Sequence, residues 1–366
     1  MKRKRNAGSK PVPRSMTPRK NPVAAPKVKE NVPVPPPAMP GEFEEQDCLV
    51  FGAGQLIRFY PQLFVDFVRA SFERVQLIGI VAPEYREIAD LLLGTAGIPL
   101  SAVEYLEGKT SSVWARDWSP FMGYNAEGVR CQFYVDRSHM RHRDDEIARK
   151  IYSQYFNDPI MEIPLAMEGG NILSNGCGLV ITSQTVAQTN HSRYTHNQIA
   201  GIFESHLGAR QWAALSPLHA ERTGHIDLFA TFLAPDFLLL GSVDANEDEI
   251  NHRALDDAAE KLRGLDISVG KLKVERIPMP SSRDANFRSY NNVIFANGVL
   301  FVPVYPQQDP KLDQRVLAMY REYVPDREVI GIDMRELAKK GGGLHCLSAN
   351  IPYPTRRFSP GSVKVA

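Results

Sequence analysis

The sequence predicts a mixed α/β protein assembled from repeated units. Short apolar runs typical of buried strands alternate with segments of helical spacing along most of the chain. Polar motifs beside glycine also recur at intervals of roughly 50 to 65 residues, as expected of stacked or radially arranged units. These motifs are Gly52-Ala53-Gly54, Arg116-Asp117, Glu168-Gly169-Gly170, Gly224-His225-Ile226-Asp227, Tyr290-Asn291-Asn292 and Gly343-Leu344-His345-Cys346.

Local patterns place the expected elements. Residues 75–82 are continuously apolar, which is typical of a buried strand, whereas the apolar residues of 61–72 recur at helical spacing. Asn297-Gly298 predicts the turn of a hairpin. The expected strands are 47–52, 75–82, 102–106, 129–135, 178–183, 237–242 and the hairpin 292–304. The expected helices are 61–72, 84–93, 144–155, 195–207, 247–262, 312–323 and 334–340.

Residues 1–42 predict a disordered, basic, proline-rich tail, and residues 43–366 predict the folded domain. A segment with few apolar side chains cannot bury enough surface to fold, and its prolines favour extended backbone. Residues 1–30 hold ten Lys or Arg against one Glu, a net charge of +9, while the whole chain has +1. Two interpretations stay open: contact with nucleic acid or another anionic partner, and a solvated tail without a dedicated partner.

Composition narrows the class of protein. No apolar run approaches the roughly 20 residues that cross a bilayer, and the N-terminus lacks the apolar segment of a secretory signal. The four cysteines, Cys48, Cys131, Cys177 and Cys346, are far apart and in no metal-ligand spacing. We therefore expect no metal site. A reducing compartment, the cytoplasm, is the simplest expectation, and it suits a free thiol.

Cys346 follows three consecutive glycines, residues 341–343. Glycine weakens regular structure, so such a run is expected where backbone passes close to another group or takes a positive φ. A cysteine on this turn is interpreted as a nucleophilic thiolate. The alternative is a buried, inert cysteine, because free cysteines are among the most buried residues.

Three further motifs favour the nucleophile. Trp114 and Trp118 flank Asp117, and aromatic walls with an acid suit a planar cation. Glu168 precedes a Gly-Gly step in an otherwise apolar stretch. If residues 224–227 form a strand, His225 and Asp227 point to the same face, as a general acid/base and a substrate anchor require. Each motif alone also fits an ordinary surface turn or a solvated strand face.

Together the motifs resemble the agmatine deiminase and bacterial peptidylarginine deiminase family, within the pentein superfamily of guanidine-modifying enzymes. The resemblance covers residues from about 47 to 352. It rests on WARDWSP (114–120), MEGGN (167–171), GHID (224–227), SYNNVIFANGVLFVPVY (289–305) and GGGLHC (341–346). It implies a five-bladed, pseudo-symmetric α/β propeller. The implied activity is that of a hydrolytic deiminase, which releases ammonia and a ureido product and needs no cofactor.

The resemblance also implies roles for single residues. Cys346 attacks the guanidinium carbon and forms a thiouronium adduct, and His225 is the general acid/base. Asp117 and Asp227 clamp the guanidinium, whose rigid N–H fork matches opposed carboxylates. Glu168 holds His225 protonated or joins the clamp, and Asn292 has a positioning role. A neighbouring imidazolium or a cationic substrate lowers the pKa of a thiol toward the thiolate.

The substrate is less defined, because the chain departs from the family pattern near His225. Ser119 replaces a glycine, Arg222-Thr223 stands where the agmatine enzymes usually have Thr-Asp before Gly-His, and Leu228 replaces an asparagine. Arg222, Arg137, Arg141 and Arg143 offer cations to a substrate carboxylate, so arginine or peptidyl-arginine is preferred over agmatine. The alternative is that these arginines only pair with Asp136, Asp144 and Asp145 on the surface. The alternatives are an agmatine deiminase proper, which serves putrescine biosynthesis, an amidinotransferase, and a binding protein without turnover.

Overall fold

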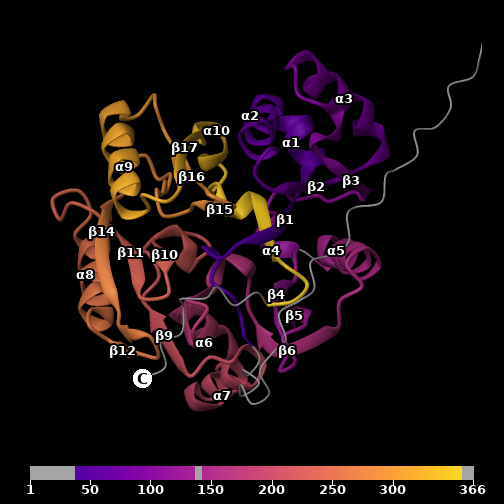
Figure 1. Ribbon diagram of the computed structural model, residues 1–366. Helices are drawn as coiled ribbons and strands as arrows, with labels where there is room; N and C mark the ends of the chain where they lie inside the picture. The colour runs from indigo at the N-terminus through magenta and orange to yellow at the C-terminus, as the bar shows by residue number, and fades with distance from the viewer. Residues whose placement is uncertain (1–37, 137–141, 357–366) are drawn as a thin grey trace, which may run out of the picture. The chain divides into compact units, whose positions relative to one another are not determined.

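The computed structural model describes residues 38–136 and 142–356 (Figure 1). Most of the predicted tail and the candidate residue Arg141 therefore lie outside the described residues. Within them, five sheets of three or four strands are present, together with one two-stranded ribbon, β12 (Asp266–Ile267) and β13 (Gly270–Lys271). The five sheets repeat one topology, because each begins with an antiparallel pair and continues with a parallel strand.

The first sheet joins residues from both ends of the described chain. Its order is β18 (Ser348–Pro352), β1 (Gln46–Phe51), β2 (Gln76–Val81) and β3 (Glu104–Glu107). β1 and β18 are antiparallel, with Phe51 opposite Ser348, and β1, β2 and β3 are parallel. This pairing connects the segment after Cys346 to the first strand of the chain.

The other four sheets follow in chain order. They are β4 (Phe121–Tyr124), β5 (Arg130–Asp136) and β6 (Ile160–Ala166); β7 (Leu173–Ser174), β8 (Leu179–Ser183) and β9 (Gln211–Leu215); β10 (Ala230–Ala234), β11 (Phe237–Ser242) and β14 (Lys273–Pro278); and β15 (Ile294–Ala296), β16 (Val299–Val304) and β17 (Glu328–Asp333). In each, the first two strands form a hairpin and the last two are parallel.

Helices connect the parallel strands, as parallel pairing requires. Figure 1 shows α8 beside β11 and β14, and α9 beside β16 and β17. The helices are α1 (Ala53–Phe59), α2 (Pro61–Ser71), α3 (Arg86–Thr95), α4 (Ala115–Trp118), α5 (His142–Tyr155), α6 (Gln184–Asn190), α7 (His196–Leu207), α8 (Glu249–Leu262), α9 (Pro310–Tyr323) and α10 (Arg335–Ala338). Short 3₁₀ turns are η1 (Pro83–Tyr85), η2 (Leu100–Ala102), η3 (Gly169–Asn171), η4 (Ile226–Leu228) and η5 (His345–Leu347). No described helix has the length and apolar character needed to cross a membrane.

The expected strands and helices are confirmed with small shifts at their ends, and α10 is shorter than the predicted helix 334–340. The sequence did not predict β6, β9, β14 and β17, the last strands of four sheets. β6, β14 and β17 mix buried positions with exposed or partly exposed ones and include charged residues, as in Lys273–Pro278, and β9 has only five residues. Because they lack the continuous apolar run of the inner strands, the pattern for a buried strand does not detect them.

One conditional prediction was wrong. The segment around Asp117, for which the sequence predicted no element, is a single helical turn, α4. Residues 226–228 form the 3₁₀ turn η4, so His225 and Asp227 do not alternate along a strand. Tight turns bring both side chains into the interior by another route, since His225 and Asp227 are both buried.

The domain begins before the predicted boundary between residues 42 and 43. Ala38 pairs with Tyr124 next to β4, and its amide nitrogen donates to the Tyr124 oxygen at 2.9 Å. Met39 hydrogen-bonds through its backbone to Leu207 and to the Ser174 hydroxyl. Residues 38–42 therefore pack against the domain and connect directly to β1.

Five turns carry the candidate site residues, and each turn lies directly before the first strand of a sheet. The turns before β4, β7, β10, β15 and β18 carry Asp117, Glu168, His225 with Asp227, Asn292, and Cys346, respectively. Gly52-Ala53-Gly54 differs, because it follows β1 and begins α1. The polar motifs therefore recur at regular spacing because five of them occupy the same position, directly before the first strand of a sheet.

Candidate active site

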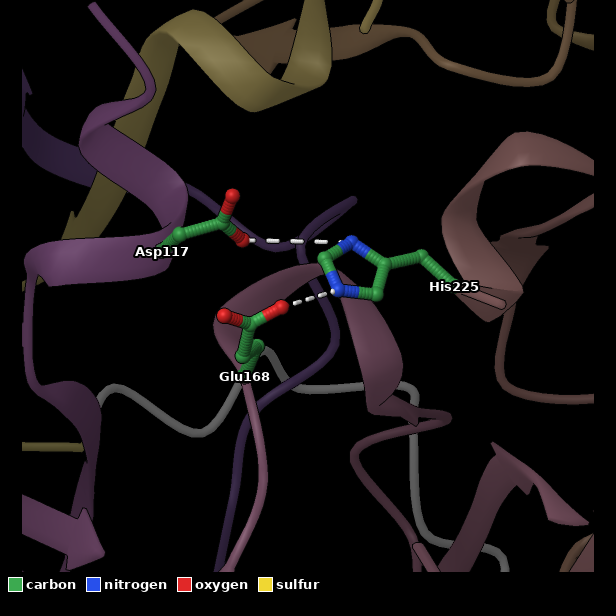
Figure 2. Close-up of side chains that lie close together, drawn as sticks. All are labelled: Asp117, Glu168 and His225. Atoms are coloured by element: carbon green, nitrogen blue, oxygen red, sulfur yellow. Dashed lines mark hydrogen bonds and ion pairs between the residues drawn. The ribbon is translucent and has the colours of Figure 1, made fainter. Parts of the chain in front are cut away.

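His225 lies between two carboxylates that reach it from different turns (Figure 2). Its Nε2 is 2.8 Å from Glu168 Oε2, and its Nδ1 is 3.9 Å from Asp117 Oδ1. Burial by itself lowers the pKa of His225, but Asp117, the hydrogen bond to Glu168 and the nearby Asp227 outweigh it and raise the pKa to about 9. The ring is therefore an imidazolium at neutral pH, and it can give up a proton.

Cys346 lies on η5 next to Asp227 and Asn292. Its Sγ is 3.8 Å from Asp227 Oδ2 and 3.7 Å from Asn292 Oδ1. Burial, followed by Asp227 and Asp117, raises the pKa of the thiol well above its usual value. The site thus holds a neutral thiol, and a cation beside it would offset the negative charges of Asp227 and Asp117.

Asp227 has one oxygen available for a ligand. Its Oδ2 accepts from His345 Nδ1 at 2.7 Å, while its buried Oδ1 has no hydrogen-bond partner among the described residues. A buried carboxylate oxygen without a donor is destabilising, so a ligand that brings N–H groups gains from binding there. Asn292 supports the turn, because its Nδ2 donates to the Asp227 carbonyl at 3.2 Å.

Close backbone approaches explain two glycines of the motifs. A Cβ on Gly170 would overlap Nδ1 of His225, and a Cβ on Gly343 would overlap Oδ1 of Asn292. Gly341 has φ +81, in the left-handed region that glycine tolerates. The prediction that the glycine run permits close approach and a positive φ is therefore confirmed.

The remaining predicted binding residues lie in different places. Trp114 is half-buried and packs against Gly342 at the edge of the site. Arg222 is exposed on the loop before His225, and no hydrogen bond or ion pair links it to another described residue. The loop itself is fixed by Glu221, whose Oε2 accepts from the backbone of Thr223 and Gly224.

Two residues next to this cluster were not predicted. The buried His345 contacts Asp227 through Nδ1 and Glu42 Oε2 through Nε2, at 2.7 and 2.6 Å. Glu42 also forms an ion pair with Arg116. His345 could have been suspected from its place in GGGLHC, but Glu42 gave no signal, because it adjoins a segment with the composition of the tail.

The environment of Cys346 differs from that of the other buried thiols. Cys48 packs in a hydrophobic cluster around Trp118 and Tyr152, and Cys131 packs among Phe121 and Phe133. Cys346 instead has the carboxylate of Asp227 and the amide of Asn292 next to its sulfur. Burial alone does not separate the cysteines, whereas their polar contacts do.

Asp117, Glu168 and His225 could also be considered as metal ligands, because one ligand atom of each lies within 4.8 Å of the others. A metal needs a neutral imidazole. The raised pKa of His225 and its 2.8 Å hydrogen bond to Glu168 oppose that state. The described cluster suits a planar organic cation better than a metal ion.

The fold and the cluster of acids, histidine and cysteine define a class, the hydrolases that deiminate guanidino groups. Residues 39–352 match the sequence model of the Porphyromonas-type peptidyl-arginine deiminases, and the chain belongs to this family. The predicted resemblance and the predicted deiminase activity are confirmed. The chain is thus a deiminase, an enzyme that hydrolyses a C–N bond of a linear amidine.

Curated relatives and solved structures agree with this assignment. The chain is 28% identical to an agmatine deiminase of Stutzerimonas stutzeri over 303 residues, which cover 72% of this chain and 80% of the relative. It is 25% identical to an agmatine deiminase of Pseudomonas fluorescens, covering 78% and 85%. The fold matches a substrate-bound agmatine deiminase of C. jejuni with a TM-score of 0.75 at 20% identity, covering 87% and 97% of the two chains. An Enterococcus faecalis agmatine deiminase gives 0.74 at 18%, covering 88% and 96%.

Proposed function

We propose that this deiminase acts on an arginine-type guanidino group, free or in a peptide, with Cys346 as its nucleophile. The observation that carries the proposal is the unpartnered Asp227 Oδ1, which lies on the carboxylate that contacts Sγ through its other oxygen. A guanidinium that donates to this oxygen would place its central carbon close to the thiol. Asp117, whose Oδ1 lies 3.9 Å from His225 Nδ1, would accept from the same planar cation.

The proposed reaction uses the charges of the site in sequence. The bound cation offsets the negative charge of Asp117 and Asp227, so the pKa of Cys346 falls and the thiolate forms. Sγ then bonds to the guanidinium carbon, and the imidazolium of His225 gives a proton to the leaving nitrogen, which departs as ammonia. The neutral His225 next takes a proton from water, whose oxygen attacks the thiouronium carbon. The C–S bond breaks, and a ureido product and the thiol are released.

Glu168 is proposed to keep His225 protonated for the first of these transfers. Its hydrogen bond to Nε2 raises the pKa of His225, together with the larger contribution of Asp117. Trp114 is proposed to form one wall of the site, and Asn292 to hold the turns of Asp227 and His345 together. Neither role requires an added cofactor.

We also propose that the five sheets are the blades of a five-bladed propeller. The support is their common topology and the common position of the site residues, directly before the first strand of each sheet. Pairing of β1 with β18 would join the first blade to the end of the chain. A solution scattering profile fitted by radial and by stacked arrangements of the sheets would distinguish the two.

A single screen tests the reaction and the substrate. Ammonia release is measured with agmatine, free arginine and peptides that contain or end in arginine. We expect an arginine-type substrate to have the highest kcat/KM, and Cys346→Ala to abolish turnover while Cys48→Ala, Cys131→Ala and Cys177→Ala change it only a few-fold. Substantial ammonia release by Cys346→Ala would refute the mechanism. A new guanidine in place of a ureido product would identify an amidinotransferase.

Arg222 is substituted separately, because the preference for a substrate that carries a carboxylate rests partly on it. It is exposed, so solvent screens its charge, and a contact of this kind contributes about 0–1 kcal/mol. Arg222→Ala should therefore lower kcat/KM for arginine only a few-fold and leave agmatine unaffected. If agmatine is the better substrate and Arg222→Ala treats both alike, the preference for arginine is wrong.

The predicted partner of the basic N-terminal segment also remains a proposal. Ten Lys or Arg in residues 1–30 suit an anionic polymer, and the family match begins only at residue 39. Deleting residues 1–37 should leave kcat nearly unchanged and weaken retention on nucleic acid, and that retention should fall steeply with salt. A large loss of catalysis after deletion would contradict this division of roles.

A further inference from the structure

His345, the residue before Cys346, is placed as a bridge between two carboxylates. It is 3% exposed, and each ring nitrogen faces a carboxylate oxygen, Asp227 Oδ2 at 2.7 Å and Glu42 Oε2 at 2.6 Å. A neutral imidazole has one N–H and one lone pair, so one of these contacts would bring two acceptors together. An imidazolium donates to both oxygens, and it is the form that this geometry favours.

Arg116 extends the bridge outward. Its guanidinium forms an ion pair with Glu42 Oε1 and donates to Asn350 Oδ1 at 2.9 Å. The order of charges from the site outward is therefore Asp227 negative, His345 positive, Glu42 negative and Arg116 positive. Burial opposes the charged form of Glu42, yet Arg116 and His345 lower its pKa to about 2, and Glu42 and Asp227 raise the pKa of His345 against the opposing effects of burial and Arg116.

This bridge fixes the rotation of the Asp227 carboxylate. His345 binds Oδ2, so Oδ1 is the oxygen left for a ligand. The backbone of His345 is itself held, because its amide nitrogen donates to Asn292 Oδ1 at 2.8 Å. Glu42 lies ahead of β1 and His345 lies ahead of β18, so their contact joins two segments that are 303 residues apart in the sequence.

We propose that Glu42 and His345 are positioning residues, which act through each other to hold the Asp227 carboxylate rotated with Oδ1 toward the guanidinium. The proposal rests on the proposed function, in which Asp227 clamps the substrate. It assigns a part in the site to the segment before the first strand, which the sequence placed in the tail. Neither residue touches the substrate itself, because Asp227 lies between them and the bound cation.

The competing explanation is purely structural. In that case Glu42 would only anchor residues 38–45 through Arg116, and its loss would disturb the whole domain rather than the orientation of one carboxylate. A measurement that compares a cationic with a neutral ligand separates the two explanations. The cationic ligand depends more strongly on Asp227 Oδ1, because its hydrogen bond to the carboxylate is charge-assisted.

The experiment uses two small alkylating reagents on the full chain, a haloacetamidine, which carries an amidinium, and the matching neutral haloacetamide. The rate of modification of Cys346 by each reagent is followed by mass spectrometry. The rate with the cationic reagent divided by the rate with the neutral one measures how well Asp227 binds the cation. We expect Glu42→Gln to lower this ratio about ten-fold and His345→Gln about a hundred-fold, since charge-assisted hydrogen bonds are lost. kcat/KM for the guanidino substrate should fall by similar factors.

Glu42→Gln is the more informative variant, because glutamine can still accept from Arg116 and donate to a neutral His345. It keeps the shape and removes the charge. Glu45→Gln is the matched control in the same segment, since Glu45 is exposed and forms no ion pair with another described residue. It should retain the ratio and the activity of the unaltered chain.

Three outcomes are distinct. A fall of the ratio in Glu42→Gln, with the melting temperature close to that of Glu45→Gln, supports the proposal. Parallel changes of both rates, or an unchanged ratio, overturn it. If the unaltered chain releases no ammonia from any guanidino substrate, or Cys346→Ala does, the proposed function fails instead, and the ratio still reports whether Glu42 orients Asp227.

Discussion

Two buried histidines lie in the site, and each has a carboxylate oxygen near both of its ring nitrogens. His345 is held at 2.7 and 2.6 Å by Asp227 and Glu42, whereas His225 is held at 2.8 Å by Glu168 but is 3.9 Å from Asp117. Both ring nitrogens of His345 are within hydrogen-bond distance of a carboxylate, and we call this geometry closed. Only one ring nitrogen of His225 is, and we call the side that faces Asp117 loose. A closed geometry suits a group that keeps its proton, while a loose one suits a group that must exchange it.

The loose side of His225 explains its proposed chemistry. A charge-assisted hydrogen bond at full strength on both nitrogens would stabilise the imidazolium further and oppose proton release. Burial lowers the pKa of His225, and Asp117 and Glu168 raise it, with a net value of about 9. The proton can therefore still be transferred near neutral pH. The difference between the two histidines therefore assigns proton transfer to one and positioning to the other.

The largest expected effect comes from exchanging each histidine for glutamine. His225→Gln removes the proposed acid and base, and general acid–base catalysis contributes about 10²- to 10⁴-fold, so kcat should fall by about 10³-fold or more. His345→Gln should reduce kcat/KM about a hundred-fold, chiefly through KM, since a clamp that is wrongly rotated binds substrate less well. Steady-state kinetics on both variants measure the split.

The same pair of variants can contradict the assignment of proton transfer to His225 and positioning to His345. If His345→Gln lowers kcat as much as His225→Gln and leaves KM unchanged, the closed histidine takes part in the chemistry. Circular dichroism and melting temperatures serve as the control, because either substitution removes a buried hydrogen-bonding group.

A smaller effect is expected in the stability of the fold. The pKa of His225 is raised from 6.5 to about 9, so its contribution is complete below pH 6.5 and is lost as the pH rises through 9. The free energy of unfolding should fall by on the order of 3 kcal/mol across this range. Urea unfolding at several pH values measures it, in a Cys346→Ala background that removes the titration of the thiol. His225→Gln should flatten the slope, and an unchanged slope would show that other groups cause it.

The smallest effect is expected from Glu168→Gln. Glutamine can still accept from His225 Nε2, but the negative charge that raises the pKa of His225 is lost. In the plot of kcat/KM against pH, the decrease on the alkaline side, the alkaline limb, should therefore move about one pH unit lower. His345→Gln should leave the limb in place if His225 alone causes it. If His345→Gln shifts this limb and Glu168→Gln does not, the alkaline limb belongs to His345 and not to His225.

The sequence predicted most of the fold and the inner part of the site, for a physical reason. Inner strands such as β2 and β11 are buried on both faces, so they read as continuous apolar runs, while edge strands such as β14 do not. His225, Asp227 and Cys346 lie on short turns with glycine, a pattern that local spacing reveals. Glu42 is different, because its role depends on a partner 303 residues away, and no local pattern encodes such a contact.

The pairing of β1 with β18 has a consequence for the newly made chain. Glu42, Asp227 and Cys346 come together only when the last sheet strand aligns with the first, which is a contact of very long sequence separation. Loop closure of this length is slow and tends to come late in folding. A ribosome-bound chain that has not yet released β18 would therefore carry an unassembled clamp and a thiol without its neighbours. Completion of the fold and assembly of the acids and amide around Cys346 would therefore be one event.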